Sequence, residues 1–181
     1  MAWVQLPYRK SNPYLPIHNM KDLEILDEFV FNQTFQLLGT LSYTTLPTWG
    51  RMTAQQMIEH LTIAVNVSNG LNKIPLITPV DKVEKTKIIL LLSDRAMPKF
   101  FHNPALPEDP IPCKHANISE AISSLKSALE LFKIHFQYDP KKTQLHNIFG
   151  ELNYTEWLWF HYKHFHHHFA QFELLSYTRE F

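Results

Sequence analysis

The chain has 181 residues, a length that suits a single domain with one sizeable core. Lys plus Arg and Asp plus Glu both number 17, so there is no net charge to attract nucleic acid or an anionic membrane surface. An apolar share of 45% argues against disorder, and the presence of only four glycines argues against a turn-rich β-sandwich or barrel. We therefore expect one helical domain over residues 1–181 that binds no nucleic acid.

The N-terminal residues 1–19 carry three prolines and no regular hydrophobic spacing, which predicts an extended arm rather than a secretion signal. The longest uninterrupted apolar run, residues 88–92, is far shorter than the ~20 residues that cross a bilayer. The lone cysteine, Cys113, excludes an intramolecular disulfide and fits a reducing compartment. These features predict a cytoplasmic protein with no membrane segment.

Hydrophobic spacing predicts two helices in the first half of the chain. The first is expected from an N-cap at Asp22 to Gly39. Its apolar stripe consists of Leu23, Leu26, Val30 and Leu37. After a loop over residues 44–50, a second helix is expected from about Thr53. Its inward stripe consists of Met57, His60, Ala64, Val67 and Leu71. This spacing directs His60 towards the core.

In the second half of the chain, hydrophobic spacing predicts a short helix followed by two long ones. After a break at residues 72–79, the short helix is expected from Asp81 until before Pro98, and five prolines make residues 98–112 irregular. Asn117 and Glu120 have capping-box spacing at the start of a helix that ends before Pro140. Its apolar seam consists of Ile118, Ile122, Leu125, Leu129, Phe132 and Phe136.

A loop is expected over residues 146–153, followed by a last helix from about Thr155 to about Tyr177. The chain then contains four long amphipathic helices and one shorter helix. This combination predicts a helical bundle.

The last predicted helix carries histidines on its inward stripe. With steps of 4, 3, 4, 3 and 4, the stripe consists of Trp157, His161, His164, His168, Gln171 and Leu175. A buried imidazole without a partner costs ~1–3 kcal/mol, so these rings need hydrogen bonds, water or a metal ion. His164 and His168 lie one helical turn apart, and their rings can converge on one ion. The alternative is that the histidines bind no metal and only pack against their neighbours in the core. His166 and His167 lie off the centre of the stripe. We expect them to lie at the surface or behind the ligands, and not to be ligands themselves.

Two segments resemble the signature stretches of a branch of the DinB/YfiT-like superfamily that is itself described only as a domain of unknown function. They are WGRMTAQQMIEH at residues 49–60 and YKHFHHHFAQF at residues 162–172. Residues 106–110 and 149–157 are similar to the connecting segments of that branch, so the resemblance extends over roughly residues 20–175. One departure is the stretch His-Asn-Ile-Phe-Gly at 146–150, where the branch usually has His-Pro-Phe-Phe-Gly.

The resemblance implies an all-α fold, an antiparallel four-helix bundle of DinB/YfiT type with a short extra helix. In that superfamily, one histidine of the second helix joins an H-x-x-x-H pair of the last helix around a divalent metal. Carried over to this sequence, the ligands are His60, His164 and His168, whereas His161 is outside the motif. A homodimer is a further expectation from the relatives.

Three neutral imidazoles leave a bound ion its full charge and an open coordination position, which is typical of catalytic sites. All-nitrogen ligation suits zinc or nickel. The resembled superfamily includes metal-dependent thiol S-transferases that use bacillithiol or mycothiol. The leading hypothesis is therefore a transferase that adds a small thiol to an electrophile, since the ion can ionise a bound thiol.

Two other functions stay open at this point. A metal-dependent hydrolase needs a general base, but Glu59 points ~100° away from His60 on a helix and there is no H-E-x-x-H motif. A non-catalytic metal-binding or scaffolding protein is compatible with every residue. Gln56 and Gln171 can either orient a ligand or serve as ordinary helix formers. Several aromatic residues can line a substrate mouth or belong to the core: Phe149, Trp157 and Trp159.

Overall fold

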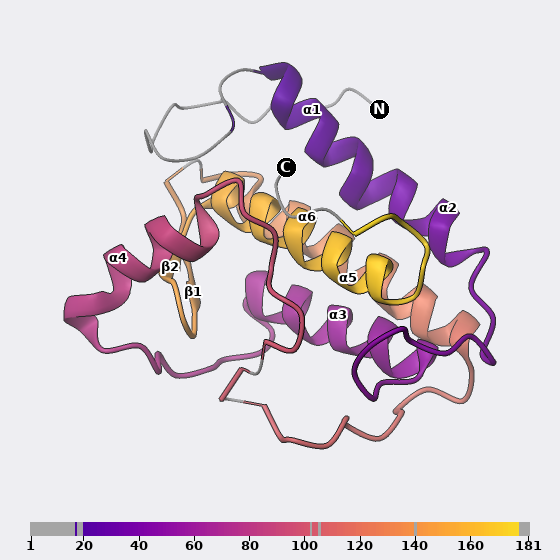
Figure 1. Ribbon diagram of the computed structural model, residues 1–181. Helices are drawn as coiled ribbons and strands as arrows, with labels where there is room; N and C mark the ends of the chain where they lie inside the picture. The colour runs from indigo at the N-terminus through magenta and orange to yellow at the C-terminus, as the bar shows by residue number, and fades with distance from the viewer. Residues whose placement is uncertain (1–16, 18–19, 102, 105, 140, 178–181) are drawn as a thin grey trace.

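Helices dominate the computed structural model, which describes residues 17, 20–101, 103–104, 106–139 and 141–177 (Figure 1). The expected N-terminal arm therefore lies outside the described residues, apart from Ile17, which is buried. None of the described helices is long and apolar enough to cross a membrane.

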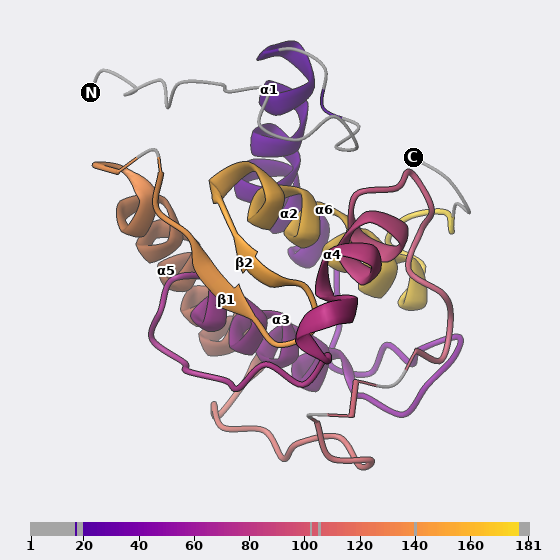
Figure 2. The same cartoon turned by 90° about the vertical axis from the view of Figure 1, so that its left-hand side faces the viewer.

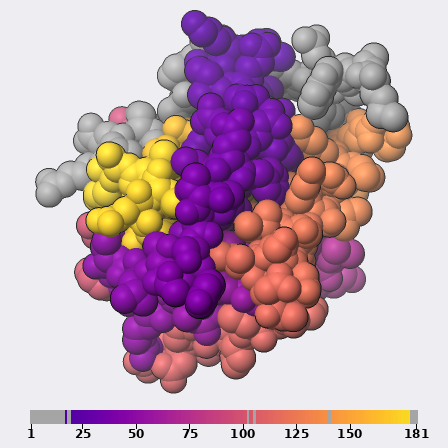
Figure 3. All heavy atoms as spheres, turned by 90° about the vertical axis from the view of Figure 1, so that its right-hand side faces the viewer, coloured from indigo at the N-terminus to yellow at the C-terminus, as the bar shows by residue number. Residues whose placement is uncertain are grey.

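The first predicted helix is confirmed as three consecutive pieces. These are α1 (Met20–Glu28), a π-helical turn (Phe29–Gln33) and α2 (Thr34–Leu38). The helix begins before Asp22, so that residue lies in the first turn and the prediction that it caps the helix is wrong. In Figure 3 this indigo segment forms a ridge between the yellow C-terminal part and the orange part of the chain. An ion pair of 3.2 Å joins Asp27 of α1 to Lys133 of α5 (Ile118–Phe136).

The second predicted helix is α3 (Ala54–Ser68). Its N-terminus has a capping box, in which Thr53 Oγ1 accepts from Gln56 N and Gln56 Oε1 accepts from Thr53 N. The helix ends before Gly70, whose φ of +81° is left-handed, and Leu71 is 64% exposed. The predicted extension of the inward stripe to Leu71 is therefore wrong, because the left-handed residue turns the chain away from the helix.

The predicted short helix is found as a 3-10 turn (Val80–Lys82), α4 (Val83–Thr86) and a π-helical turn (Lys87–Leu91). It is attached to α6 (Tyr154–Gln171) by two buried lysines. Lys87 Nζ lies 3.3 Å from Glu156 Oε1, and Lys163 Nζ donates to three backbone carbonyls at the end of the short helix. These bonds satisfy carbonyls that a helix end leaves without partners.

The long helix predicted after Asn117 is α5, and it packs against α3. Asn117 Oδ1 accepts from Glu120 N, as predicted. The Glu120 carboxylate accepts from Ala116 N instead of Asn117 N, so the predicted capping box forms only in its first half. The centre and end of the predicted seam are fully buried at Leu125, Leu129, Phe132 and Phe136.

The expectation of an exclusively helical chain is wrong, because the described residues include two β-strands. The predicted loop over residues 146–153, together with the two residues before it, contains an antiparallel hairpin of β1 (Gln144–His146) and β2 (Gly150–Leu152), which Figure 2 shows beside α4. Three residues connect the strands, and Gly150 takes a φ of +71°. His146 Nδ1 accepts hydrogen bonds from the N–H groups of Ile148 and Phe149 inside the turn. Strands of three residues are too short to show an alternating hydrophobic pattern.

Helix α6 lies at the centre of the core, because 13 of its 18 residues are buried and apolar contacts surround it. Its N-terminus has a capping box between Asn153 and Glu156. It ends at Gln171, six residues before the predicted end at Tyr177. Glu173 has a left-handed φ of +57°, and Leu174 N donates to Phe169 O while Glu173 N donates to Ala170 O. This is a Schellman motif, formed here without the glycine that usually marks it in a sequence.

Replacing Glu173 by glycine is expected to stabilise the protein by about 1 kcal/mol, because glycine takes the left-handed conformation without the steric cost of a Cβ atom. Urea denaturation measures the change. Glu173→Ala removes the same charge but keeps the Cβ atom, so it should bring no gain. Equal stabilisation by glycine and alanine would assign the effect to charge and contradict the conformational explanation.

Candidate metal centre

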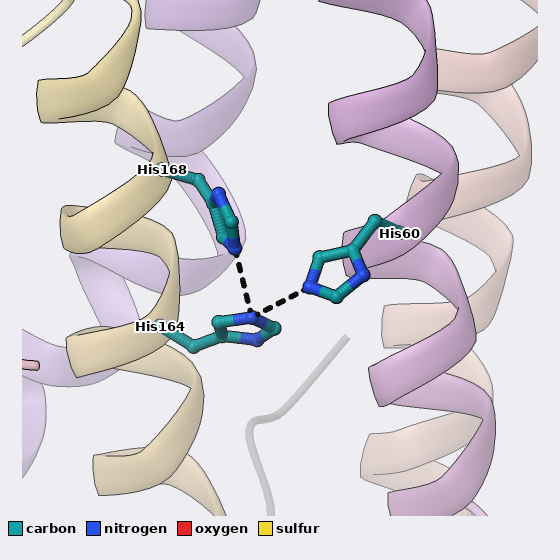
Figure 4. A group of neighbouring side chains, drawn as sticks. All are labelled: His60, His164 and His168. Carbon is teal, nitrogen blue, oxygen red and sulfur yellow. Dashed lines mark hydrogen bonds between the residues drawn. The ribbon is translucent and has the colours of Figure 1, made fainter. Parts of the chain in front are cut away.

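Three histidines that are far apart in sequence meet between two facing helices. His60 projects from α3, and His164 and His168 project from adjacent turns of α6, as Figure 4 shows. The Nε2 atom of His164 lies 3.0 Å from Nε2 of His60 and 3.1 Å from Nε2 of His168. One nitrogen from each ring lies within 4.8 Å of the others. The structure thus brings together all three residues that the sequence predicts as ligands.

The local sequence explains this arrangement. The two histidines of α6 are four residues apart and share a face, and His60 occupies the inward stripe of the neighbouring helix. In a tetrahedral zinc site with Zn–N bonds of 2.0–2.1 Å, ligand nitrogens are ~3.3 Å apart. The two observed separations are a few tenths of an ångström shorter, so a small movement of the side chains admits an ion.

The hydrogen-bonding capacity of the rings also fits a shared ion. Each nitrogen of a neutral imidazole carries either one hydrogen or one lone pair. His164 Nε2 is close to two other ring nitrogens, yet it can form an ordinary hydrogen bond with only one of them. A cation placed between the three lone pairs removes this mismatch.

All three rings are held in the neutral form that ligation requires. Burial, followed by the charge of His167, lowers the pKa of His60 to about 4. Burial and the charges of neighbouring histidines hold the pKa values of His164 and His168 well below the usual range. At neutral pH each ring therefore offers a lone pair, and the donor set fits a divalent ion.

One glutamine contacts the cluster directly. Gln171 Oε1 lies 2.9 Å from Nδ1 of His168, and Gln171 Nε2 donates to Trp49 O over 2.6 Å. The sequence left open whether this glutamine orients a ligand or only packs, and the structure places it against a ligand candidate. His164 Nδ1 is buried and has no hydrogen-bond partner among the described residues.

Glu59 and Gln56 point to other contacts. The Glu59 carboxylate accepts hydrogen bonds from the backbone N–H groups of Lys114 and His115. Gln56 completes the capping box and donates to Ile111 O. Both side chains therefore hold the irregular segment 108–115 against α3. Gln56 consequently does not orient a ligand. The expectation that Glu59 faces away from His60 is confirmed.

Four more histidines, whose roles the sequence did not define, lie outside the cluster. His146 holds the hairpin turn, and His161 Nε2 lies 2.8 Å from Ser68 Oγ. Burial lowers the pKa of both to about 3. The ring of His166 stacks on Phe29, and His167 Nδ1 donates to Met97 O. None of these four rings is part of the cluster, and His161 Nδ1 is buried without a hydrogen-bond partner among the described residues.

The aromatic residues considered for a substrate mouth belong to the core. Phe149, Trp157 and Trp159 are all buried, and each of the two indole N–H groups donates to a backbone carbonyl. Cys113 is exposed and lies on segment 108–115.

These observations define a mostly helical protein with a buried three-histidine cluster that can hold a metal ion. The chain belongs to the DUF1569 family, described as a protein of unknown function, whose model matches residues 20–174. No match was found among curated proteins or among solved structures. The matched range contains all three histidines of the cluster together with Gln171.

Proposed function

We propose that this protein is a DinB/YfiT-type transferase that adds a small thiol to an electrophile through a divalent ion, zinc or nickel, held by His60, His164 and His168. The observation that carries the proposal is the convergence of three neutral ring nitrogens from two helices. A divalent ion bound there lowers the pKa of a coordinated thiol and so supplies a thiolate near neutral pH. The partners in this proposal are the thiol, the electrophile and, in the assembled protein, a second copy of the chain.

The arrangement of the long helices supports the DinB/YfiT comparison. The helical segment α1–α2 contacts α6, and α3 contacts both α5 and α6. Four long helical segments with mutual contacts are what an antiparallel four-helix bundle requires, and α4 with its flanking turns supplies the short extra helix.

The surroundings of the cluster favour a thiol cosubstrate. His164 and His168 are buried, while His60 is only partly buried, so we infer that small molecules reach the cluster from the side of His60. The ring of Phe160 lies 5.2 Å from the ring of His164 and forms part of an apolar wall. In such a low-dielectric environment, electrostatic interactions with a bound ion are strengthened.

The position of Glu59 supports thiol transfer over hydrolysis. Hydrolysis of a stable amide needs a general base beside the attacking water. The Glu59 carboxylate is occupied by N–H donors of segment 108–115, and the cluster found among the described residues contains histidines alone. A thiol that the ion ionises needs no such base.

Metal-loaded protein is expected to consume a small thiol in the presence of a halonitroarene or an epoxide, because the cluster can bind an ionised thiol. The assay follows loss of free thiol over a panel that includes bacillithiol, alongside ester and amide hydrolysis. His164→Ala separates metal-dependent turnover from the background reaction. Metal-dependent hydrolysis with every thiol inert would reverse the assignment, and inactivity in both assays would favour a non-catalytic metal-binding protein.

A further inference from the structure

Gln171 makes two hydrogen bonds that together fix the direction of its side-chain amide. Trp49 O is a carbonyl oxygen and can only accept, so the amide nitrogen of Gln171 must face it. The amide oxygen then faces Nδ1 of His168 at 2.9 Å. An amide oxygen can only accept, and His168 Nδ1 must therefore carry the hydrogen.

This hydrogen defines the tautomer of His168. A neutral ring with its hydrogen on Nδ1 has its lone pair on Nε2, and Nε2 is the atom that points to His164. The contact with Gln171 thus presents His168 in the form that binds a metal. The same contact also restrains rotation of the ring.

Gln171 is itself held by the loop that leads into α3. Its backbone carbonyl accepts from both N and Oγ1 of Thr48, and the residue is only 4% exposed. Gly50 has a φ of +79°, and a Cβ atom on it would lie 2.5 Å from Gln171 Nε2. Glycine at this position leaves room for the amide while the chain turns towards the helix that carries His60.

We propose that Gln171 is a positioning residue, fixed by residues 48–50, that sets the ligating tautomer and the ring orientation of His168. The inference rests on the metal site of the proposed function and adds a residue to it. Partners of this kind behind a metal ligand typically contribute 10–100-fold to metal affinity.

The first test measures zinc affinity by competition with a chromophoric chelator. Gln171→Leu keeps the volume of the side chain but removes both hydrogen bonds, and a 10–100-fold loss of affinity is expected. Gln171→Glu keeps an acceptor for Nδ1–H and should bind zinc more tightly than Gln171→Leu. Gln137→Leu, at the half-buried end of α5, is the matched control and should bind zinc like the wild type.

The second test needs no variant that might misfold and no metal. Long-range ¹H–¹⁵N correlation spectra of the metal-free wild-type protein report which nitrogen of His168 carries the hydrogen, and Nδ1 is expected. A hydrogen on Nε2, or wild-type zinc affinity in folded Gln171→Leu, would overturn the role of Gln171. Failure of the wild-type protein to bind zinc would instead contradict the metal site itself, while the tautomer measurement still decides whether Gln171 sets the form of His168.

Discussion

Replacing His60 or His168 by alanine is expected to lower the affinity for zinc or nickel by orders of magnitude, whereas the wild-type protein should bind about one ion per chain. Each substitution leaves only two of the three imidazoles that can bind the ion. Elemental analysis after dialysis and a competition titration measure the loss. Equal metal content in the wild type and both variants would contradict a site formed by these residues.

Two other histidines of α6 provide controls for this experiment. His166 stacks on Phe29 and His161 contacts Ser68, so neither ring joins the cluster. His166→Ala and His161→Ala should therefore retain the ion, although loss of the fully buried His161 ring is expected to lower stability. Loss of the ion in these variants would mean that richness in histidine, and not the three predicted ligands, explains metal binding.

The metal-free protein is expected to lose stability steeply as the pH falls below about 6.5. His146 and His161 have folded-state pKa values of about 3, lowered by burial from 6.5. Between these pH values the unfolded chain binds more protons than the folded chain, so acid favours unfolding. The loss begins as the pH falls through 6.5, and from about pH 5.5 down towards 3 each histidine removes ~1.4 kcal/mol per pH unit.

Urea denaturation at pH 7 and pH 5 in the presence of a chelator measures this dependence. His161→Gln removes one of the titrating groups and is expected to reduce the loss of stability between pH 7 and pH 5 by ~2 kcal/mol, even if its stability at pH 7 is lower. A loss equal to that of the wild type would show that His161 does not contribute. The chelator is needed because protonation of the cluster would otherwise release a bound ion in the same pH range.

The long helices were predictable because their apolar residues recur with helical spacing and their starts carry caps such as Thr53 and Asn117. The errors occur where a local signal was absent or misleading. Glu173 ends α6 in a conformation that glycine usually takes, and Asp22 is a cap-forming residue within a helix. The hairpin at residues 144–152 depends on His146 accepting two N–H groups, an arrangement that only the folded turn creates.

The three histidines of the candidate site were predictable from helical spacing together with the two signature segments. The contact of Gln171 with His168 follows from their separation of three residues on one helix. The opposite contact, with Trp49 O, joins residues 122 positions apart and has no counterpart in the local sequence. It is this long-range bond that fixes the direction of the amide, and sequence spacing could not reveal it.

The segment 108–115 has no regular secondary structure, yet its path along α3 is held almost entirely through its own backbone. Arg51, Gln55 and Gln56 donate to backbone carbonyls of the segment, and Glu59 accepts from two of its N–H groups. An ion pair between the side chains of Arg51 and Asp109 is largely exposed and contributes little. Every residue type except proline supplies both backbone groups. The hydrogen bonds from Arg51 and from α3 therefore determine the course of this segment. Its own side chains can differ between relatives without altering that course.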